Sequence, residues 1–402
     1  MQVIDSDSLF DVLDDANEAR GMRVVMSGHF ATPLGALAIV DEALPEYRLV
    51  LMNSHLPIPD RHGVTLESAF LGPTSRKLEK TKVRYIPSRL SQVPALFRST
   101  LIPDVVIVHT TLGENGMVSL GSEVNCLPAA ISAVKARGGL AIAVANEAVP
   151  YTYGDSEYYA NAFDYIVPMN SELTYAPKAE PTLLQKIIAE NVAMLIPEYA
   201  TLQVGIGAVP NAVCEALENR HDLSVYTEMF SDGVMGLEQA GAIGRSSPLI
   251  TSFVLGSAEL FKWLDHNSRV LMFRTEQTND PSRISGYPRM VSLNAAMQID
   301  LHGQVNASYV NGQVHSGFGG ATDYLVGALH SKNGRAIIAL PSWHPKANVS
   351  TIVREIEGPV TSFQPSYIVT EYGVAELLGH DEEEQARSII NIAHPSVRNS
   401  LS

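Results

Sequence analysis

The sequence predicts an α/β protein made of two similar open α/β domains, each with a mostly parallel sheet. Three observations lead to this prediction. Short apolar runs rich in β-branched residues recur along the chain, helical patterns lie between several of them, and the two halves repeat several segments in the same order. Alternation of strands with helices is typical of parallel sheets covered by helices on both faces.

The expected strands are short and nearly all apolar, as strands covered on both faces should be. They are residues 23–26, 48–52, 104–108, 140–144, 202–204, 249–254 and 336–340. The clearest helical patterns are residues 128–137, 190–195 and 211–217.

The two halves resemble each other when the chain is compared with itself. Gly28 precedes Pro33 by the same spacing that separates Gly205 from Pro210. Three further pairs of segments follow in the same order: 113–119 with 300–306, 139–144 with 334–339, and 164–167 with 366–369. We therefore expect a duplication, with domains at 1–180 and 181–402 and the linker within 168–183. Two packed domains predict an active site in the cleft between them.

Composition excludes several classes of function. The chain has 402 residues and a net charge of −15, which argues against binding to nucleic acid. No apolar run reaches the length of a membrane helix, and the acidic N-terminus does not resemble a signal peptide. The two cysteines, Cys126 and Cys214, have no metal-type spacing, so we expect a cytoplasmic protein without a metal site.

Four segments combine turn glycines with polar groups: 205–210, 227–233, 291–306 and 316–323. Glycines let the backbone approach a ligand closely and can direct N–H groups at an oxyanion. The alternative is that these are tight turns between strands and helices. The 205–210 loop lacks the dinucleotide pattern G-x-G-x-x-G because position 210 is proline.

Three glutamates follow apolar runs and are candidates for chemistry: Glu228, Glu371 and Glu147. Their positions do not rank them, and Glu228 could simply be a carboxylate at a helix start. The twelve histidines are scattered, which favours structural roles. There is no G-x-S-x-G elbow and no Walker motif, which disfavours a serine hydrolase and a P-loop protein.

Taken together, the motifs resemble the acetyl-CoA hydrolase/transferase family, in the branch of family I CoA-transferases that acts on 4-hydroxybutyrate and butyryl-CoA. The resemblance spans nearly the whole chain in family order. It is carried by residues 113–121, 154–156, 205–210, 227–234, 291–295, 300–305, 316–320, 370–374 and 391–395.

The resemblance implies a role for particular residues. Glu228 falls on the family nucleophile, which forms a glutamyl-CoA thioester. Asn294 and the glycines Gly319 and Gly320 fall near the oxyanion of the reacting carbonyl. The expected CoA-binding residues are Gly205, Ile206, Gly207, Ala208, Val209 and Gly317. The family uses coenzyme A or acyl-CoA as substrate and a small carboxylic acid as its partner, with no permanently bound cofactor, and we expect a homodimer or higher homo-oligomer.

The chain departs from the family pattern around these residues. The usual arginine after the glycine motif is replaced by 325–327, and 341–347, 144–146 and 53–65 also differ. The departures concern acyl specificity more than activity. Two alternatives remain: an acyl-CoA hydrolase, in which water resolves the thioester, and an inactive CoA-binding or assembly subunit.

Overall fold

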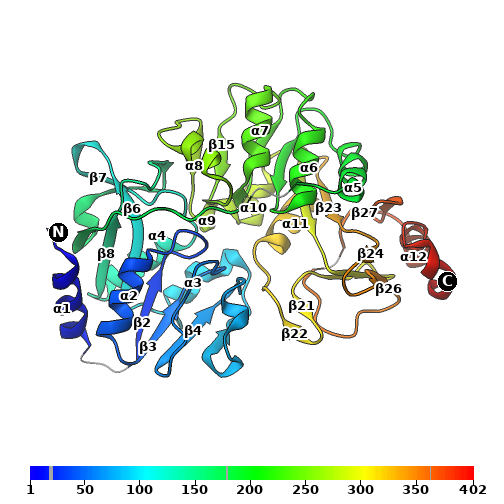
Figure 1. The fold of residues 1–402 in the computed structure, drawn as a ribbon. Helices are drawn as coiled ribbons and strands as arrows, with labels where there is room; N and C mark the ends of the chain where they lie inside the picture. Colours follow the sequence, from blue (N-terminus) through cyan, green and yellow to red (C-terminus); the bar gives the residue numbers. More distant parts are fainter. Residues whose placement is uncertain (18–20, 178–179, 363) are drawn as a thin grey trace. The chain divides into compact units, whose positions relative to one another are not determined.

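The computed structural model describes residues 1–402 apart from 18–20, 178–179 and 363. By its contacts the chain forms two units, Met1–Ala176 with Ser252–Glu276, and Pro177–Thr251 with Gln277–Ser402 (Figure 1). The described residues between Pro168 and Leu183 form no helix or strand, and Lys178 and Ala179 of the expected linker lie outside the described residues. The boundaries 1–180 and 181–402 remain a prediction.

The first unit contains an eight-strand path in which every neighbouring pair is parallel. In sheet order the strands are β1 (Gln2–Val3), β11 (Tyr165–Pro168), β8 (Leu140–Ala145), β6 (Val105–Leu112), β2 (Met22–Met26), β3 (Tyr47–Val50), β4 (Val64–Ser68) and β5 (Val83–Tyr85). Off this path, β7 (Met117–Ser119) pairs antiparallel with β6 and β10 (Glu157–Tyr159), and β9 (Tyr153–Gly154) pairs with β17 (Val270–Met272). The unit also holds β16 (Phe253–Val254) and the helices α1 (Ser6–Ala16), α2 (Leu34–Ala43), α3 (Val93–Phe97), α4 (Leu127–Ala136) and α8 (Ala258–Leu264).

The second unit has a sheet of the same kind. In sheet order its strands are β28 (Gly373–Glu376), β27 (Tyr367–Thr370), β23 (Arg335–Ala339), β18 (Met290–Ala295), β12 (Thr201–Val204), β13 (Ser224–Tyr226) and β15 (Leu249–Thr251). All pairs are parallel except β27 with β28. Its helices are α5 (Leu183–Ala193), α6 (Ala208–Ala216), α7 (Asp232–Ala240), α10 (Pro281–Ser285), α11 (Ala321–His330), α12 (Glu382–Asn391) and α13 (Arg398–Leu401), and α9 (Thr275–Thr278) precedes α10. Short strands follow the main ones: β14 (Met229–Phe230), β19 (Gln298–Asp300), β20 (Val305–Asn306), β21 (Tyr309–Val310), β22 (Gln313–Val314), β24 (Trp343–His344), β25 (Val349–Ser350) and β26 (Ile352–Val353).

The two sheets share one strand order. The path β11–β8–β6–β2–β3–β4 of the first unit matches β27–β23–β18–β12–β13–β15 of the second, strand for strand along the sequence. The α/β class with large, mostly parallel sheets is therefore confirmed, and the common order is what a duplication predicts.

Local sequence accounts for these elements. Strands such as β6 and β8 are apolar along most of their length because helices cover the sheet, and their central residues are buried. Helix α5 begins at a capping box in which Thr182 and Gln185 exchange hydrogen bonds. Helix α7 ends at Gly241, whose φ of 79° suits a residue without a Cβ atom.

One expected strand is wrong. Residues 249–254 form two short strands, β15 and β16, which are separated at Ser252. The carbonyl oxygen of Ser252 accepts hydrogen bonds from the N–H groups of Val124 and Asn125, at 3.0 and 3.1 Å. These bonds draw the backbone out of the strand path, and the uniformly apolar run gives no sign of them.

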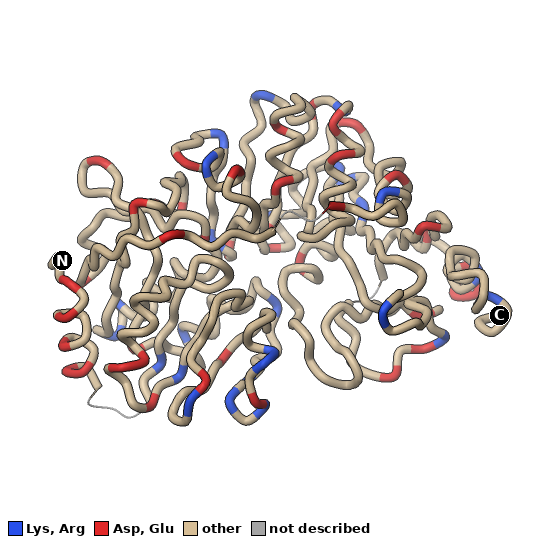
Figure 2. Tube along the Cα trace, in the orientation of Figure 1, with Lys and Arg blue, Asp and Glu red and all other residues tan. Residues whose placement is uncertain are grey.

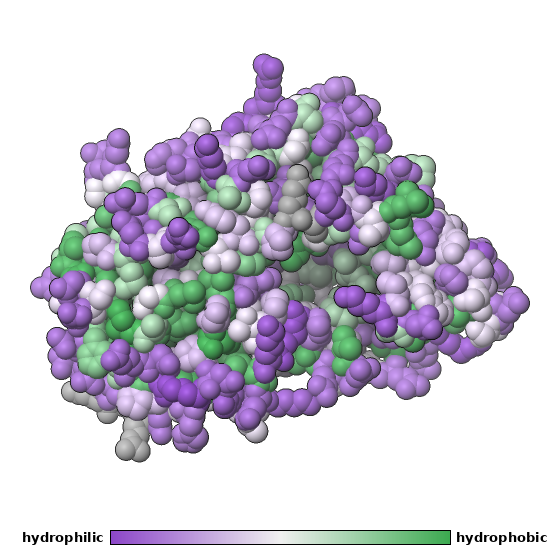
Figure 3. Space-filling model, in the orientation of Figure 1, coloured by the Kyte–Doolittle hydropathy of each residue, from purple (hydrophilic) through white to green (hydrophobic). Residues whose placement is uncertain are grey.

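Charged residues are spread over both units, and acidic side chains outnumber basic ones (Figure 2). Hydrophilic residues cover much of the face drawn in Figure 3, with hydrophobic residues in separate patches. In the described part of the chain, no helix has the length and hydropathy of a membrane span.

The buried carboxylate of Glu67, on β4, accepts hydrogen bonds from two arginines, one on the adjacent strand β5 and one on β2, two strands away. Arg23 on β2 donates from Nε at 2.7 Å, and Arg84 on β5 donates from Nη1 at 2.8 Å. Arg23 is nearly buried, with 11% of its side chain exposed, whereas Arg84 is 59% exposed. The two ion pairs share one acid but differ in burial, which makes them a matched comparison.

We predict that Arg23→Met destabilises the protein by about 1–3 kcal/mol, because the buried Oε2 atom of Glu67 loses its donor while Arg84 still pairs with Oε1. Arg84→Met should cost only about 0–1 kcal/mol, the range for exposed pairs. Urea unfolding of both variants measures the difference. Equal losses would show that burial does not govern this pair of contacts.

Candidate functional site

The candidate site of the second unit lies at the carboxyl ends of its parallel strands, where ligands of such sheets bind. Strand β12 ends at Val204 and is followed by the loop Gly205–Gly207, after which α6 begins. Gly207 has a φ of 115°, and a Cβ atom built on it would meet nothing within 4 Å. The loop is therefore open around Gly207, and Ile206 is 47% exposed.

The backbone at Glu228 is fixed from both sides. Strand β13 ends at Tyr226, and the next residue, Thr227, donates from its hydroxyl to the Val204 carbonyl of β12 at 3.2 Å. Thr251, at the end of β15, donates from its hydroxyl to the carbonyl oxygen of Glu228 at 3.2 Å. Both threonines are fully buried. The backbone at Glu228 is thus held between the ends of β12 and β15, the two strands that flank β13, and its side chain is half-buried.

Two residues far along the chain contact the Glu228 carboxylate. Asn279 donates from Nδ2 to Oε2 at 2.7 Å. Gly320 lies so close that a Cβ atom on it would stand 1.6 Å from the same oxygen. The structure therefore brings Glu228, Gly320 and Asn279 together.

The pKa of Glu228 is raised to about 7, mainly by burial. The negative charge of Asp323, in the first turn of α11, raises the pKa further, and the hydrogen bond from Asn279 lowers it. Near neutral pH the carboxyl group is consequently present in both forms. A carboxylate poised at this pH suits acid–base or nucleophilic chemistry.

Asn294 has different neighbours. Its Nδ2 atom donates to Gln203 Oε1 at 3.1 Å and to Ser292 Oγ at 2.9 Å. Leu293 pairs with Val204 across β18 and β12, so Asn294 stands level with Gly205. The structure thus places Asn294 beside the glycine loop, with its amide nitrogen turned to the two strands and not to Glu228.

The glycine-rich segment before α11 bends through two positive φ angles, 151° at Gly317 and 56° at Gly319. Ser308 donates from its hydroxyl to the Gly317 carbonyl at 2.7 Å, which fixes the start of the bend. Gly320 follows with a φ of −98°, an angle open to any residue. Its need for glycine comes from its closeness to Glu228 and not from its backbone angle.

The other two candidate carboxylates have other surroundings. Glu371 accepts two hydrogen bonds from Ser342, from N at 2.9 Å and from Oγ at 2.6 Å, one on each oxygen. Glu147 is exposed, and its N–H group donates to Asn170 Oδ1 at 3.0 Å. Of the three glutamates, Glu228 is the one packed against glycine at a strand end.

Asn279 is the site residue that sequence reasoning missed. It lies 51 residues from Glu228, in a Thr-Asn-Asp-Pro turn before α10, and is fully buried. Such a turn is a common helix start. Its complete burial could not be read from the sequence, so no signal separated it from an ordinary cap.

The first unit has a counterpart of this site. Val25 pairs with Val50 there, as Leu202 pairs with Val225 in the second unit. Gly28 follows Val25 by the same spacing that separates Gly205 from Leu202, so the matching position after β3 is Asn53, where the second unit has Glu228. An amide replaces the carboxylate.

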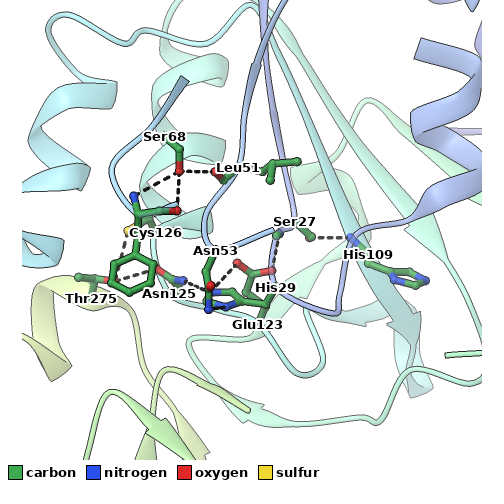
Figure 4. Close-up of polar contacts among 12 residues, drawn as sticks. Ser27, His29, Leu51, Asn53, Ser68, His109, Glu123, Asn125, Cys126 and Thr275 are labelled. Atoms are coloured by element: carbon green, nitrogen blue, oxygen red, sulfur yellow. Dashed lines mark hydrogen bonds and ion pairs between the residues drawn. The ribbon is translucent and has the colours of Figure 1, made fainter. Parts of the chain in front are cut away.

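The counterpart loop is filled by the protein's own side chains, which gather around His29 in Figure 4. The N–H group of Gly28 donates to Glu123 Oε2 at 2.7 Å, and the ring nitrogens of His29 lie 3.2 and 3.3 Å from the amides of Asn53 and Asn125. Burial raises the pKa of Glu123 to about 8 and lowers that of His29 to about 3. At neutral pH this cluster is thus largely uncharged, and its members contact one another.

Comparison with known proteins shows which proteins the chain is similar to. The family model for the acetyl-CoA hydrolase/transferase C-terminal domain matches residues 256–402. The chain is 37% identical to a 4-hydroxybutyrate coenzyme A transferase of Clostridium kluyveri over 82% of this chain and 79% of that protein. It is 35% identical to a succinyl-CoA:acetate/propanoyl-CoA:succinate CoA transferase of Fasciola hepatica, over 98% and 86%. The crystal structure of RipA from Yersinia pestis superposes with a TM-score of 0.89 at 27% identity, covering 99% of this chain and 98% of that one.

The buried Glu123 carboxyl group makes stability depend on pH. A carboxyl group with a raised pKa binds more protons in the folded state, so its contribution to the free energy of unfolding falls as pH rises from about 4.5 to about 8. We predict that Glu123→Gln, which keeps an acceptor for Gly28, becomes more stable relative to wild type by up to about 1.4 kcal/mol per pH unit in this window. Urea unfolding at several pH values measures it, and the opposite slope from His29 cancels because both proteins contain His29. A difference that stays constant with pH would contradict the prediction.

Proposed function

We propose how this chain, which belongs to the acetyl-CoA hydrolase/transferase family and is a CoA-transferase, carries out its reaction. It moves CoA between an acyl-CoA and a free carboxylic acid through a thioester on Glu228. The observation that carries the proposal is the Glu228 carboxylate, held by Asn279 and packed against Gly320 at the carboxyl edge of a parallel sheet. Such a covalent route requires a carboxylate that can ionise near neutral pH and can be reached by an acyl group.

The proposed steps balance as follows. The Glu228 carboxylate attacks the thioester carbonyl and the C–S bond breaks. CoA departs as its thiolate, and an acyl-glutamyl anhydride remains. The thiolate then attacks Cδ of Glu228, which releases the first acid as a carboxylate and leaves glutamyl-CoA. A second carboxylate enters and the steps run in reverse. Each exchange is thereby divided into easier covalent steps.

The remaining expected residues keep their proposed roles. The backbone at Gly319 and Gly320 is proposed to stabilise the oxyanion, and the 205–210 loop with Gly317 to contact CoA. Asn294 is proposed as an oxyanion donor. Because its amide hydrogens are engaged by Gln203 and Ser292, this role requires one of those bonds to be exchanged for a bond to the oxyanion.

The relatives' names indicate the class of acid. The two named above act on 4-hydroxybutyrate and on succinate, acetate or propanoate, so we propose a short-chain acid here. The family description also includes hydrolases, which makes hydrolysis of glutamyl-CoA by water the second candidate. The cytoplasmic location, which was expected from the two cysteines, and the homo-oligomeric state remain proposals.

One assay separates the candidate reactions. The protein is mixed with an acyl-CoA and isotopically labelled acetate. Labelled acetyl-CoA supports transfer, and free CoA without labelled acetyl-CoA supports hydrolysis. The appearance of neither, across several short acyl-CoA donors, would contradict both.

We predict that Glu228→Gln loses exchange by several orders of magnitude while still binding CoA, because it removes the covalent nucleophile. Mass spectrometry of the wild-type protein after incubation with acyl-CoA should find CoA attached to the peptide that contains Glu228. Borohydride should reduce the thioester of this adduct and so inactivate the protein. Glu371→Gln is the control and should keep the adduct, since Ser342 already occupies that carboxylate. Normal turnover in Glu228→Gln would remove Glu228 from the mechanism.

We also predict that Gly320→Ala abolishes exchange, because the new Cβ atom would overlap the Glu228 carboxylate. The control is Gly236→Ala in α7, where the nearest atom is 3.7 Å away and alanine should stabilise the helix by up to about 1 kcal/mol. Activity per folded molecule, with folding checked by circular dichroism, measures both. Full activity in Gly320→Ala would show that Glu228 does not react in this position.

A further inference from the structure

A single hydrogen-bonded chain fixes the amide of Asn279. Thr278 donates from its hydroxyl to Asn279 Oδ1 at 2.8 Å, and both residues are fully buried. With Oδ1 so occupied, the amide presents its nitrogen to Glu228 and donates to Oε2 at 2.7 Å. The hydroxyl of Thr278 therefore determines which end of the amide faces the carboxylate.

The backbone leading to Asn279 is hydrogen-bonded to β13, the strand that precedes Glu228. Tyr226, the last residue of β13, donates from its hydroxyl to the carbonyl oxygen of Gln277 at 2.6 Å. Beyond Asn279, the Asp280 carboxylate accepts from the N–H group of Ser282 at 2.8 Å and starts α10. The segments that carry the donor, Asn279, and the acceptor, Glu228, are thus hydrogen-bonded to each other, as a preorganised site requires.

Gly320 completes the setting of this hydrogen bond. A Cβ atom there would stand 1.6 Å from Glu228 Oε2 and 2.3 Å from Asn279 Nδ2. The pair of atoms is therefore packed against the Gly320 backbone. Within the described part of the chain Oε1 accepts no hydrogen bond, so Oε1 is the oxygen left to attack.

We propose, resting on the function proposed above, that Asn279 orients the Glu228 carboxylate for attack through Oε1 and then stabilises the oxyanion on Oε2. When Oε1 bonds to the acyl carbon, Oε2 becomes the carbonyl oxygen of the glutamyl group. When the thiolate adds to Cδ, the carbonyl electron pair moves onto Oε2, and it returns as the Cδ–Oε1 bond breaks and the acid leaves. The Asn279 N–H group faces Oε2 throughout both steps.

Asn279 also acts on the ionisation of Glu228. Burial and the charge of Asp323 raise the pKa of Glu228, and the hydrogen bond from Asn279 opposes both. Loss of this bond raises the pKa, so the rise of the rate with pH moves to higher pH. A residue needed only for folding would not move this limb of the pH profile.

The test compares Asn279→Ala, Asn279→Asp, Thr278→Val and Thr278→Ser in the full-length protein. We expect the rate of glutamyl-CoA formation to fall by about 10²–10³ in Asn279→Ala, the range for loss of one oxyanion donor, with KM for acyl-CoA little changed. Asn279→Asp keeps the shape but adds a negative charge and should be at least as slow. Thr278→Val should be slower by about tenfold, the effect of one neutral hydrogen bond, and Thr278→Ser, which keeps the hydroxyl, should restore the rate.

The readouts separate this inference from the proposed function. A wild-type adduct on Glu228, with slow formation and a pH limb shifted upward in Asn279→Ala, supports both. A wild-type adduct with an unchanged rate and pH limb in folded Asn279→Ala overturns the role of Asn279 alone. Absence of any adduct and of exchange in wild type overturns both. Should Asn279→Ala fail to fold, equal rates for Thr278→Val and Thr278→Ser still overturn the inference.

Discussion

The missing side chain at Gly320 lets the start of α11 approach the Glu228 carboxylate more closely than any other residue would allow. The same vacancy accommodates the amide of Asn279, so the carboxylate, the amide and the glycine backbone pack as one group. Strand ends position the other side of this group, through Thr227 and Thr251. The geometry of the proposed site thus depends on the absence of a side chain at Gly320, supported by hydrogen bonds at the strand ends.

The two units show how one strand order can serve opposite purposes. In both, a glycine loop follows one strand, and a matching position with a polar side chain follows the next. In the second unit that position is Glu228 and the loop is open at Gly207. In the first unit the position is Asn53, and the internal carboxyl group of Glu123 binds the Gly28 N–H group. The buried cluster of the first unit is hydrogen-bonded internally, whereas the second unit keeps an ionisable carboxyl group, which its proposed function requires.

Much of the fold could be predicted from sequence because buried parallel strands are uniformly apolar, and the strands around Val106 and Ile142 follow this rule. The break at Ser252 could not be predicted, since it depends on a carbonyl group meeting Val124 from another part of the chain. Glu228 and Gly320 came from resemblance to a family, and position alone did not rank Glu228 above Glu371. The partners of Asn294 depend on the register of β12 and β18, which the amino-acid pattern does not specify.

Asp323 lies in the first turn of α11, close enough for its charge to oppose ionisation of Glu228. Whenever Glu228 is ionised in the free protein, its charge and that of Asp323 repel each other. In the proposed cycle, an acyl group or CoA attached to Glu228 removes one of these charges. Acylation would remove this repulsion, so Asp323 would disfavour the ionised carboxylate relative to the uncharged covalent intermediate.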